Sequence, residues 1–213
     1  AARDILMNHP YQSLQPVIDF LTVAAADPAV MAIKQTIYRT GEDSELMQIL
    51  LRAAQAGKEV TVVVELMARF DEQTNINWAA KLEEVGAHVV YGVVGHKTHA
   101  KMSLVLRREG KALKRYGHLG TGNYHPRTAR LYTDFGLMTA DPRFCADIDR
   151  VLTQLTGLGS RRPMNVPLQA PFPRPAGMVA PTRAEPAAAR HVRRPRPLRR
   201  RSSLARRPHP TRP

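Results

Sequence analysis

An α/β fold, built on a mixed and mostly parallel sheet flanked by helices, is predicted for residues 1–160. Strand and helix patterns alternate along this part, and strands joined through helices pair in parallel by right-handed crossovers. The strands are also almost continuously apolar, as in Glu59–Leu66, which indicates a sheet covered on both faces. Residues 161–213 show neither pattern.

Each expected element has its own signal. Val17–Ala26 has apolar residues at helical spacing and ends before an Asp-Pro pair. Asp43–Ala56 is amphipathic, and Gly57 is placed to cap its end. Glu109-Gly110 signals the turn of a β-hairpin. The expected helices are Val17–Ala26, Asp43–Ala56, Asn77–Val85 and Pro142–Leu155, and the expected strands are Val30–Tyr38, Glu59–Leu66, His88–Val94, Ala100–Arg108, Leu113–Leu119 and Thr133–Thr139.

Charge divides the chain at about residue 160. The formal net charge of +14 comes almost wholly from residues 161–213, which hold 14 Arg, the single acid Glu185 and 12 of the 17 prolines. Such a segment cannot bury enough apolar surface to offset its ordering entropy, so we expect a disordered Arg/Pro-rich tail. An abrupt change to Arg, Pro and Ala without Lys is what a shifted reading frame in GC-rich DNA produces, and we favour that origin. The alternative is a polybasic arm that binds polyphosphate, nucleic acid or an acidic membrane surface through counterion release.

Composition also limits the compartment. The single cysteine, Cys145, excludes an internal disulfide framework and is typical of a reducing compartment. No apolar run is long enough to span a bilayer, and the first residues lack a signal-peptide core. We therefore expect a cytoplasmic protein, with peripheral attachment to the inner membrane left open. Because Ala1 is not an initiator Met, the sequence is also expected to begin inside a longer protein.

Three chemically active residues recur at a spacing of 30, namely Arg39, Arg69 and His99. The arginines follow two expected parallel strands at their carboxyl ends, where open α/β sheets bind ligands. If the strand after His99 runs antiparallel, all three residues meet in one crevice. Arginine suits phosphate because its planar fork donates two parallel charge-assisted hydrogen bonds. An arginine after a strand is more often a solvated surface residue, but the shared spacing and the histidine favour a functional role.

A second cluster combines His99 and Lys101 with Gly120 and Gly122. Residues two apart on a strand point to the same face, so His99 and Lys101 can address one ligand. A neutral imidazole accepts a phosphoryl group, and a neighbouring lysine neutralises the transferring phosphate. The glycines allow backbone N–H groups to approach an anion closely. Either motif alone is weak evidence, but in this order they favour phosphoryl transfer.

Two family resemblances follow from these motifs. His-x-Lys followed by Gly-x-Gly-Asn is similar to half of the phospholipase D superfamily site, which uses two such halves and a phosphohistidine intermediate. The usual Asp five residues after the Lys is replaced by Leu106. The surrounding sequence resembles polyphosphate kinase more closely, over roughly the first 160 residues. The segments that carry this resemblance are His9-Pro10-Tyr11, Ile33–Arg39, Val62–Asp71, Lys97–Lys101, Gly120–Tyr124 and Ala129–Asp134.

The resemblance to polyphosphate kinase implies specific residue roles. His99 matches the phosphorylated histidine, with Lys101 beside it, and Tyr132 matches a tyrosine that contacts the nucleotide. Arg39 and Arg69 match two arginines associated with the Mg²⁺–phosphate group of ATP. Since a guanidinium cannot ligate a cation, we expect both to bind phosphate, with Mg²⁺ held by phosphate oxygens and water and by no direct protein ligand. Asn123, in the Gly-x-Gly-Asn motif, is expected to bind ATP or polyphosphate.

The implied fold is the first phospholipase-D-like half of the catalytic domain, at residues 1–160. The implied reaction is reversible transfer of the ATP γ-phosphate to inorganic polyphosphate, with ADP as product, in a homo-oligomeric enzyme without specific nucleic-acid partners. Nothing after Arg161 resembles the second half, so the activity of this chain by itself stays open. A phospholipase-D-like phosphodiesterase and a non-enzymatic polyanion-binding fragment remain alternatives. A zinc site formed by His96, His118 and His125 is disfavoured by poor ligand spacing.

Overall fold

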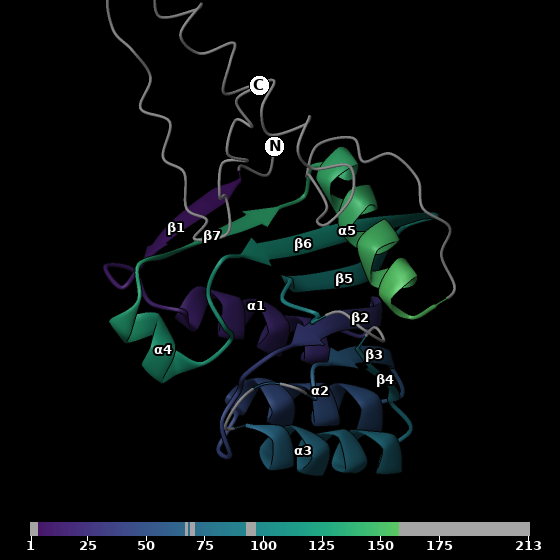
Figure 1. Ribbon diagram of the computed structural model, residues 1–213. Helices are drawn as coiled ribbons and strands as arrows, with labels where there is room; N and C mark the ends of the chain where they lie inside the picture. Colours follow the sequence, from purple (N-terminus) through teal and green to yellow (C-terminus); the bar gives the residue numbers. More distant parts are fainter. Residues whose placement is uncertain (1–3, 67, 69–70, 93–96, 158–213) are drawn as a thin grey trace, which may run out of the picture. The chain divides into compact units, whose positions relative to one another are not determined.

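The computed structural model describes residues 4–66, 68, 71–92 and 97–157, which form a mixed sheet with helices on both faces (Figure 1). The sheet has seven strands in the order β1-β7-β6-β5-β2-β3-β4. Its strands are β1 (Ile5–His9), β2 (Val30–Ile37), β3 (Glu59–Val64), β4 (His88–Tyr91), β5 (Lys101–Glu109), β6 (Ala112–Gly120) and β7 (Asp134–Thr139). The helices are α1 (Gln15–Ala26), α2 (Glu45–Gln55), α3 (Glu72–Glu84), α4 (Pro126–Leu131) and α5 (Pro142–Leu155).

The α/β class and the mixed, helix-flanked sheet are confirmed, but the expectation that most of the sheet would be parallel is wrong. Only β2–β3 and β3–β4 pair in parallel, while the other four pairings are antiparallel. The reason lies in the connections. Helices α2 and α3 make crossovers between the parallel strands, whereas β5 and β6 are joined by the expected tight hairpin turn and β1 adds a further antiparallel strand at the edge.

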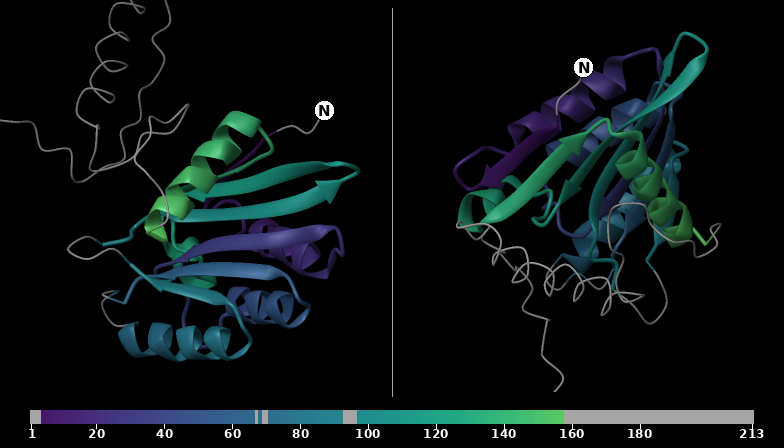
Figure 2. Two further views of the ribbon diagram at one scale, coloured as in Figure 1. Left: turned by 90° about the vertical axis from the view of Figure 1, so that its right-hand side faces the viewer. Right: turned by 90° about the horizontal axis from the view of Figure 1, so that it is seen from above.

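The two faces of the sheet carry cores of different size. On one face, α1, α2 and α3 pack on β2 and β3 through side chains such as Leu21, Leu50 and Leu82, with Ile33 and Val62 facing them. Helix α5 covers the opposite face with a smaller core, whose buried side chains among the described residues are Leu104, Cys145, Ile148 and Leu152. Figure 2 shows α1 and α5 on opposite sides of the strands. Residues adjacent along a strand therefore serve different cores.

Helix boundaries follow capping chemistry. Helix α2 begins where the Ser44 hydroxyl accepts a hydrogen bond from the Met47 N–H, and it is followed by Gly57 at a φ of +79°. Helix α3 begins at Glu72, five residues before the expected Asn77. Its first turns bury the polar Asn75, which interrupts the apolar period on which the expectation relied. No helix in the described ranges is long and apolar enough to cross a membrane.

Candidate active site

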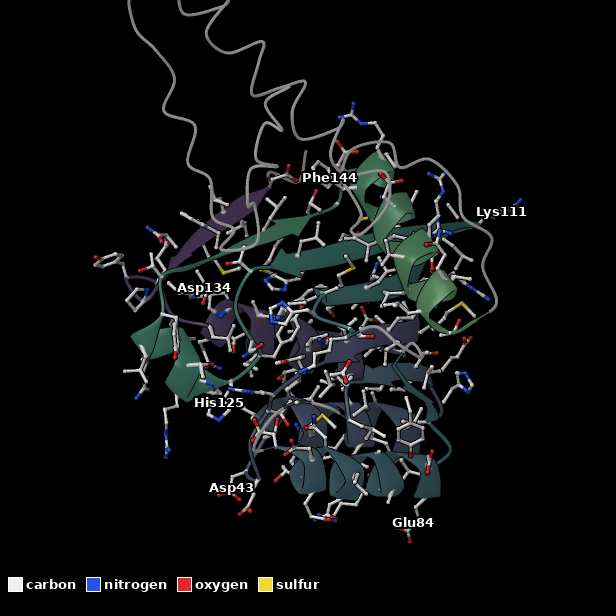
Figure 3. All side chains as sticks on the ribbon, viewed as in Figure 1. Asp43, Glu84, Lys111, His125, Asp134 and Phe144 are labelled. Carbon is white, nitrogen blue, oxygen red and sulfur yellow. The ribbon has the colours of Figure 1, made fainter. Side chains whose placement is uncertain are left out.

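Several strand ends meet at one edge of the sheet. Strands β2 and β3 end there, and because β5 runs antiparallel to β2, it begins there. By the same alternation β6 ends and β7 begins at this edge. In Figure 3, Asp134 and His125 lie at this edge, while Lys111 in the β5–β6 turn lies at the far end of the sheet. The sequence-based expectation that His99 returns to the edge of Arg39 is therefore met.

His99 lies against an aromatic ring that follows β2. The Tyr38 and His99 ring centroids are 4.7 Å apart in an edge-to-face arrangement with an interplanar angle of 77°. This contact takes part of the imidazole out of water although His99 remains exposed to solvent. Partial burial, then the positive charges of Lys101, Arg39 and Lys97, hold the pKa of His99 below its ordinary 6.5. The imidazole is consequently neutral at pH 7, which is the form that acts as a nucleophile.

Lys101, the first residue of β5, is a buried cation at the centre of the site. Its side chain is only 4% exposed, and its Nζ donates to the backbone oxygen of His99 at 2.7 Å. The same Nζ lies 4.8 Å from the Tyr38 ring centroid. Burial lowers the pKa of the Lys101 ammonium to about 8, with Asp134 opposing and Arg39 reinforcing the shift. Lys101 thus remains mostly charged at pH 7 while bonded to the backbone of the histidine.

A threonine hydroxyl fixes the start of β5. Thr36 Oγ1 donates to the backbone oxygen of Ala100 at 2.8 Å and accepts from the backbone N–H of Met102 at 2.9 Å. These two bonds flank Lys101 on the chain, so the end of β2 sets the position of the lysine.

Arg39 lies beside Tyr38, the residue that contacts His99. Its guanidinium carbon is 5.7 Å from the Tyr38 ring centroid, and its Nε is 3.4 Å from an Asp71 carboxylate oxygen. That Nε is buried, and its contact with Asp71 is an ion pair rather than a hydrogen bond. Arg69, the second arginine expected here, lies outside the described residues, as does His96.

The glycine-containing loop after β6 packs on a carboxylate. A Cβ at Gly122 would lie 2.7 Å from the Asp134 Oδ2, so only glycine fits this approach. The Thr121 hydroxyl donates to Asp134 Oδ1 at 2.7 Å and accepts from the Phe135 N–H at 2.9 Å. Asp134, which raises the pKa of Lys101, is therefore held by the loop that carries Asn123.

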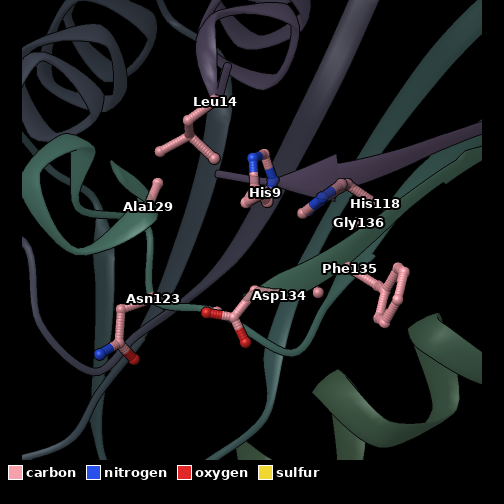
Figure 4. Close-up of a pocket in the computed structure, with 10 residues that line it drawn as sticks. His9, Leu14, His118, Asn123, Ala129, Asp134, Phe135 and Gly136 are labelled. Atoms are coloured by element: carbon pink, nitrogen blue, oxygen red, sulfur yellow. The ribbon is translucent and has the colours of Figure 1, made fainter. Parts of the chain in front are cut away.

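A small cavity lies behind this loop. Figure 4 shows His9, His118, Asn123 and Asp134 on its wall. The Asn123 Oδ1 and the His118 Nε2 are buried there and have no hydrogen-bond partner in the described part. His118 Nδ1 lies 2.8 Å from the Tyr124 hydroxyl, and burial, followed by the influence of His9, lowers the pKa of His118 to about 4. His118 is therefore a neutral buried group.

Tyr132 stands apart from the buried cluster. It follows α4, a short helix that begins where His125 Nδ1 accepts from the Arg127 N–H. Its side chain is 62% exposed, which leaves the ring accessible to a ligand. The site therefore brings together His99, Lys101 and Arg39 directly, with Tyr132 on the loop that leads to Asp134.

Three residues of the site were not singled out from the sequence, namely Tyr38, Thr36 and Asp134. All three lie in segments that carry the resemblance to polyphosphate kinase. The antiparallel pairing of β5 with β2 places Tyr38 and Thr36 beside the His99–Lys101 segment, and the antiparallel β5–β6–β7 arrangement brings Asp134 to it. Leu106, where a phospholipase D site carries Asp, lies well inside β5 and packs on the α5 core. A carboxylate close to the lysine is supplied by Asp134 instead.

Comparison with known proteins decides the family. The model of the polyphosphate kinase C-terminal domain 1 matches residues 1–161. The chain belongs to this family. As a polyphosphate kinase C-terminal domain 1, it is 64% identical over 188 residues to the polyphosphate kinase of Burkholderia cenocepacia and 63% identical over 194 residues to that of Paraburkholderia phytofirmans. These matches cover 86% and 89% of the chain, but the chain spans only 27% and 28% of the length of these relatives.

Solved structures agree with this assignment. The polyphosphate kinase of Porphyromonas gingivalis matches with a TM-score of 0.72 and 33% identity, over 89% of this chain and 32% of that one. Nuc from Salmonella typhimurium, a phospholipase D family member, matches with a TM-score of 0.55 and 14% identity, over 74% of this chain and 97% of that one. The second match shows that this polyphosphate kinase domain has a phospholipase-D-like fold.

Proposed function

We propose that this domain supplies the first half of the catalytic centre of an ATP:polyphosphate phosphotransferase, with His99 as the phosphorylated residue. The observation that carries the proposal is the position of a neutral imidazole beside two cations, Lys101 and Arg39. Phosphoryl transfer requires a nucleophile and positive charge at the same point, because catalysis comes mainly from positioning and electrostatic stabilisation.

In the proposed reaction an imidazole nitrogen of His99 attacks the γ-phosphorus of ATP. The N–P bond forms as the bond to the β,γ-bridging oxygen breaks, and ADP leaves with that electron pair. A terminal oxygen of polyphosphate then attacks the phosphohistidine, which breaks the N–P bond and lengthens the chain by one phosphate. Both steps are reversible. Lys101 and Arg39 offset the charge that the phosphate oxygens carry in each transition state.

We propose that Mg²⁺ arrives with the nucleotide, held by phosphate oxygens and water. No group of three His, Cys, Asp or Glu within the described ranges is placed to hold a metal ion. Asp71 and Asp134 are engaged by Arg39 and by Thr121, respectively. The metal would supply further charge neutralisation on the phosphates.

Contacts with the phosphates or the nucleotide are proposed for four further residues, Arg39, Arg69, Tyr132 and Asn123. The Arg39 guanidinium, which is ion-paired with Asp71 through Nε, adds positive charge beside His99 and Lys101, which suits a phosphate oxygen. Arg69 is proposed as a second phosphate ligand and Tyr132 as a contact for the nucleotide, because both match residues with these roles in polyphosphate kinases. Asn123 is proposed to bind ATP or polyphosphate from the loop that holds Asp134.

A chimeric kinase tests this proposal. In the polyphosphate kinase of Burkholderia cenocepacia, the segment that aligns with residues 1–161 is replaced by this chain's own residues 1–161. We expect the chimeric kinase to make polyphosphate from ATP, and we expect His99→Ala to abolish synthesis. His88→Ala is the matched control, since His88 is exposed at the amino end of β4, away from the site. Synthesis that persists in His99→Ala would refute the assignment.

The same chimeric kinase distinguishes phosphoryl transfer to polyphosphate from the alternative, a phosphodiesterase activity. The chimeric kinase is offered bis(p-nitrophenyl) phosphate without ATP, and release of nitrophenol is measured. We expect none above the rate of the His99→Ala variant. Release that depends on His99 in the absence of polyphosphate synthesis would favour a phospholipase-D-like phosphodiesterase.

Broader properties follow as proposals from the family. We propose that the intact enzyme is a homo-oligomer in the cytoplasm, with peripheral attachment to the inner membrane left open. Residues 161–213 carry 14 Arg and are proposed to bind polyanions without sequence specificity. Sedimentation of the chimeric kinase tests its oligomeric state. Binding of the full chain to polyphosphate at increasing salt tests the polyanion binding of residues 161–213.

A further inference from the structure

Glu65 is a buried carboxylate at the point where β3 ends. Its side chain is 4% exposed. Its backbone N–H donates to the Ile37 oxygen at 2.9 Å, and its backbone oxygen accepts from Asn75 Nδ2 at 2.9 Å. The same Asn75 amide donates to the backbone oxygen of Tyr38 at 3.0 Å. The backbone of Glu65 is therefore tied to the end of β2 and to α3.

The carboxylate of Glu65 reaches the residue before His99. Its Oε2 accepts from the backbone N–H of Thr98 at 2.6 Å, and Thr98 is itself 5% exposed. A bond to an ionised acceptor is shorter and roughly twice as strong as a neutral one. Glu65 thus holds the main chain of the histidine segment from one side, while the Tyr38 ring contacts the His99 imidazole from another.

We propose that Glu65 is a positioning residue for His99, acting through its hydrogen bond to the Thr98 N–H. Because Tyr38 and Glu65 are both bonded to Asn75, the aromatic contact and the backbone anchor share one rigid support. His99 reaches the γ-phosphate in a fixed orientation only while both are in place. Misplacement by about 1 Å can cost a reaction about a hundredfold in rate, so such an anchor matters. The inference rests on the proposed role of His99 as the phosphorylated residue.

The test uses the full 213-residue chain and needs no turnover. Hydrogen exchange of the Thr98 N–H and the chemical shifts of the His99 ring protons are measured by NMR in wild type, Glu65→Gln, Glu65→Ala and the control Glu59→Gln. Glu59 is an exposed carboxylate at the opposite end of the same strand. We expect Glu65→Ala to speed Thr98 exchange about tenfold or more, because it removes a charge-assisted acceptor. The His99 ring protons should lose the ring-current shift caused by Tyr38.

Glu65→Gln keeps an oxygen acceptor and should rescue most of the protection and the His99 ring-current shift, with the Thr98 N–H moving upfield as its acceptor becomes neutral. Glu59→Gln should leave all three readouts unchanged. Thermal unfolding shows whether each variant folds. If Glu65→Ala does not fold, the chemical shift of the Thr98 N–H in Glu65→Gln tests the proposal. Thr98 and His99 signals that are the same in every variant that folds would overturn the proposal. The proposed function can fail independently of this proposal. In that case the NMR signals would respond to the Glu65 substitutions as described, but His99 would never be phosphorylated.

Discussion

At the scale of single residues, Lys101 lies where a cation suits phosphate binding but lowers the stability of the fold. The ammonium is almost fully buried at the start of β5, where its main partners are the backbone oxygen of His99 and the face of the Tyr38 ring. Burial holds the pKa in the folded protein at about 8, below the ordinary 10.5. The charged form therefore opposes folding, which is the expected cost of placing a cation where a phosphate will bind.

Replacing Lys101 by methionine should accordingly stabilise the fold. Below pH 8 the charged lysine carries its full penalty, and the penalty disappears between pH 8 and 10.5, where the folded and then the unfolded state lose the proton. We expect Lys101→Met to raise the free energy of unfolding at pH 7 by on the order of 1–3 kcal/mol. The gain should shrink as the pH approaches 10.5.

Urea unfolding at pH 7 and pH 10 measures this gain. Lys111→Met, at the exposed turn between β5 and β6, is the control and should change little at either pH. Destabilisation by Lys101→Met that is equal at both pH values would contradict the assignment of the lowered pKa.

Arg39 gives a second prediction at this scale. In the chimeric kinase, Arg39→Ala should lower polyphosphate synthesis by ~10²–10³-fold, because removal of one preorganised donor to a transferring group typically costs this much. The fold should be retained, since Arg39 lies beyond the end of β2. Arg52→Ala, an exposed arginine on α2, serves as the matched control. Unchanged synthesis in Arg39→Ala would make Arg39 a surface residue.

The sequence predicted part of this site because its signals are local. The sequence predicts that His99 and the arginine after β2 meet at one edge if the strand after His99 runs antiparallel, and β5 does pair antiparallel with β2. The contacts among them depend on register and on rings from other strands. Tyr38 and Glu65 lie in segments that carry the family resemblance, but neither is assigned a role there, because the burial of a carboxylate and a contact between rings on different strands cannot be read from the neighbouring sequence.

At the scale of elements, strong periodicity explains what was predicted. Helix α5 was expected at Pro142–Leu155 and has those bounds, and β2, β3 and β5 differ from expectation by two residues or fewer at each end. Strand β1 and helix α4 were not predicted. Strand β1 is an edge strand that ends in the polar pair Asn8-His9, and α4 has six residues of which only Ala129 is buried. Such elements form through tertiary pairing rather than through a pattern of their own.

The packing of α5 on β6 depends on a glycine. A Cβ at Gly117 would lie 2.6 Å from Ile148 Cδ1, so an alanine there must displace the end of the Ile148 side chain. We expect Gly117→Ala to destabilise the fold by about 1 kcal/mol, the low end of the cost of overpacking, because the end of the Ile148 side chain can move. Ile148→Val removes the Cδ1 atom, so the double variant should lose less stability than the sum of the two single changes. Chemical denaturation of all four proteins measures the coupling, and strictly additive effects would show that α5 does not approach through Gly117.

At the scale of the whole molecule, the distribution of charge along the sequence predicts two separable parts. Residues 1–160 are nearly neutral, whereas residues 161–213 carry almost the whole net charge. The boundary itself stays a prediction, because residues 158–213 lie outside the described residues.

Truncation after Gly159 tests that boundary. We expect the thermal transition of the α/β unit to be nearly unchanged, since few buried contacts should be lost. Affinity for polyphosphate in the full chain should fall steeply with salt and largely vanish after truncation. A marked drop in the transition temperature would show that residues 160–213 pack on the α/β unit.

Phosphorylation of His99 is tested most directly by labelling the chimeric kinase with γ-³²P-ATP and mapping the modified residue by mass spectrometry. We predict an acid-labile, base-stable adduct on His99 that ADP removes and that polyphosphate accepts. The adduct should be absent in His99→Ala and retained in His88→Ala. A label that survives in His99→Ala, or that maps to another residue while polyphosphate is being made, would contradict the role of His99.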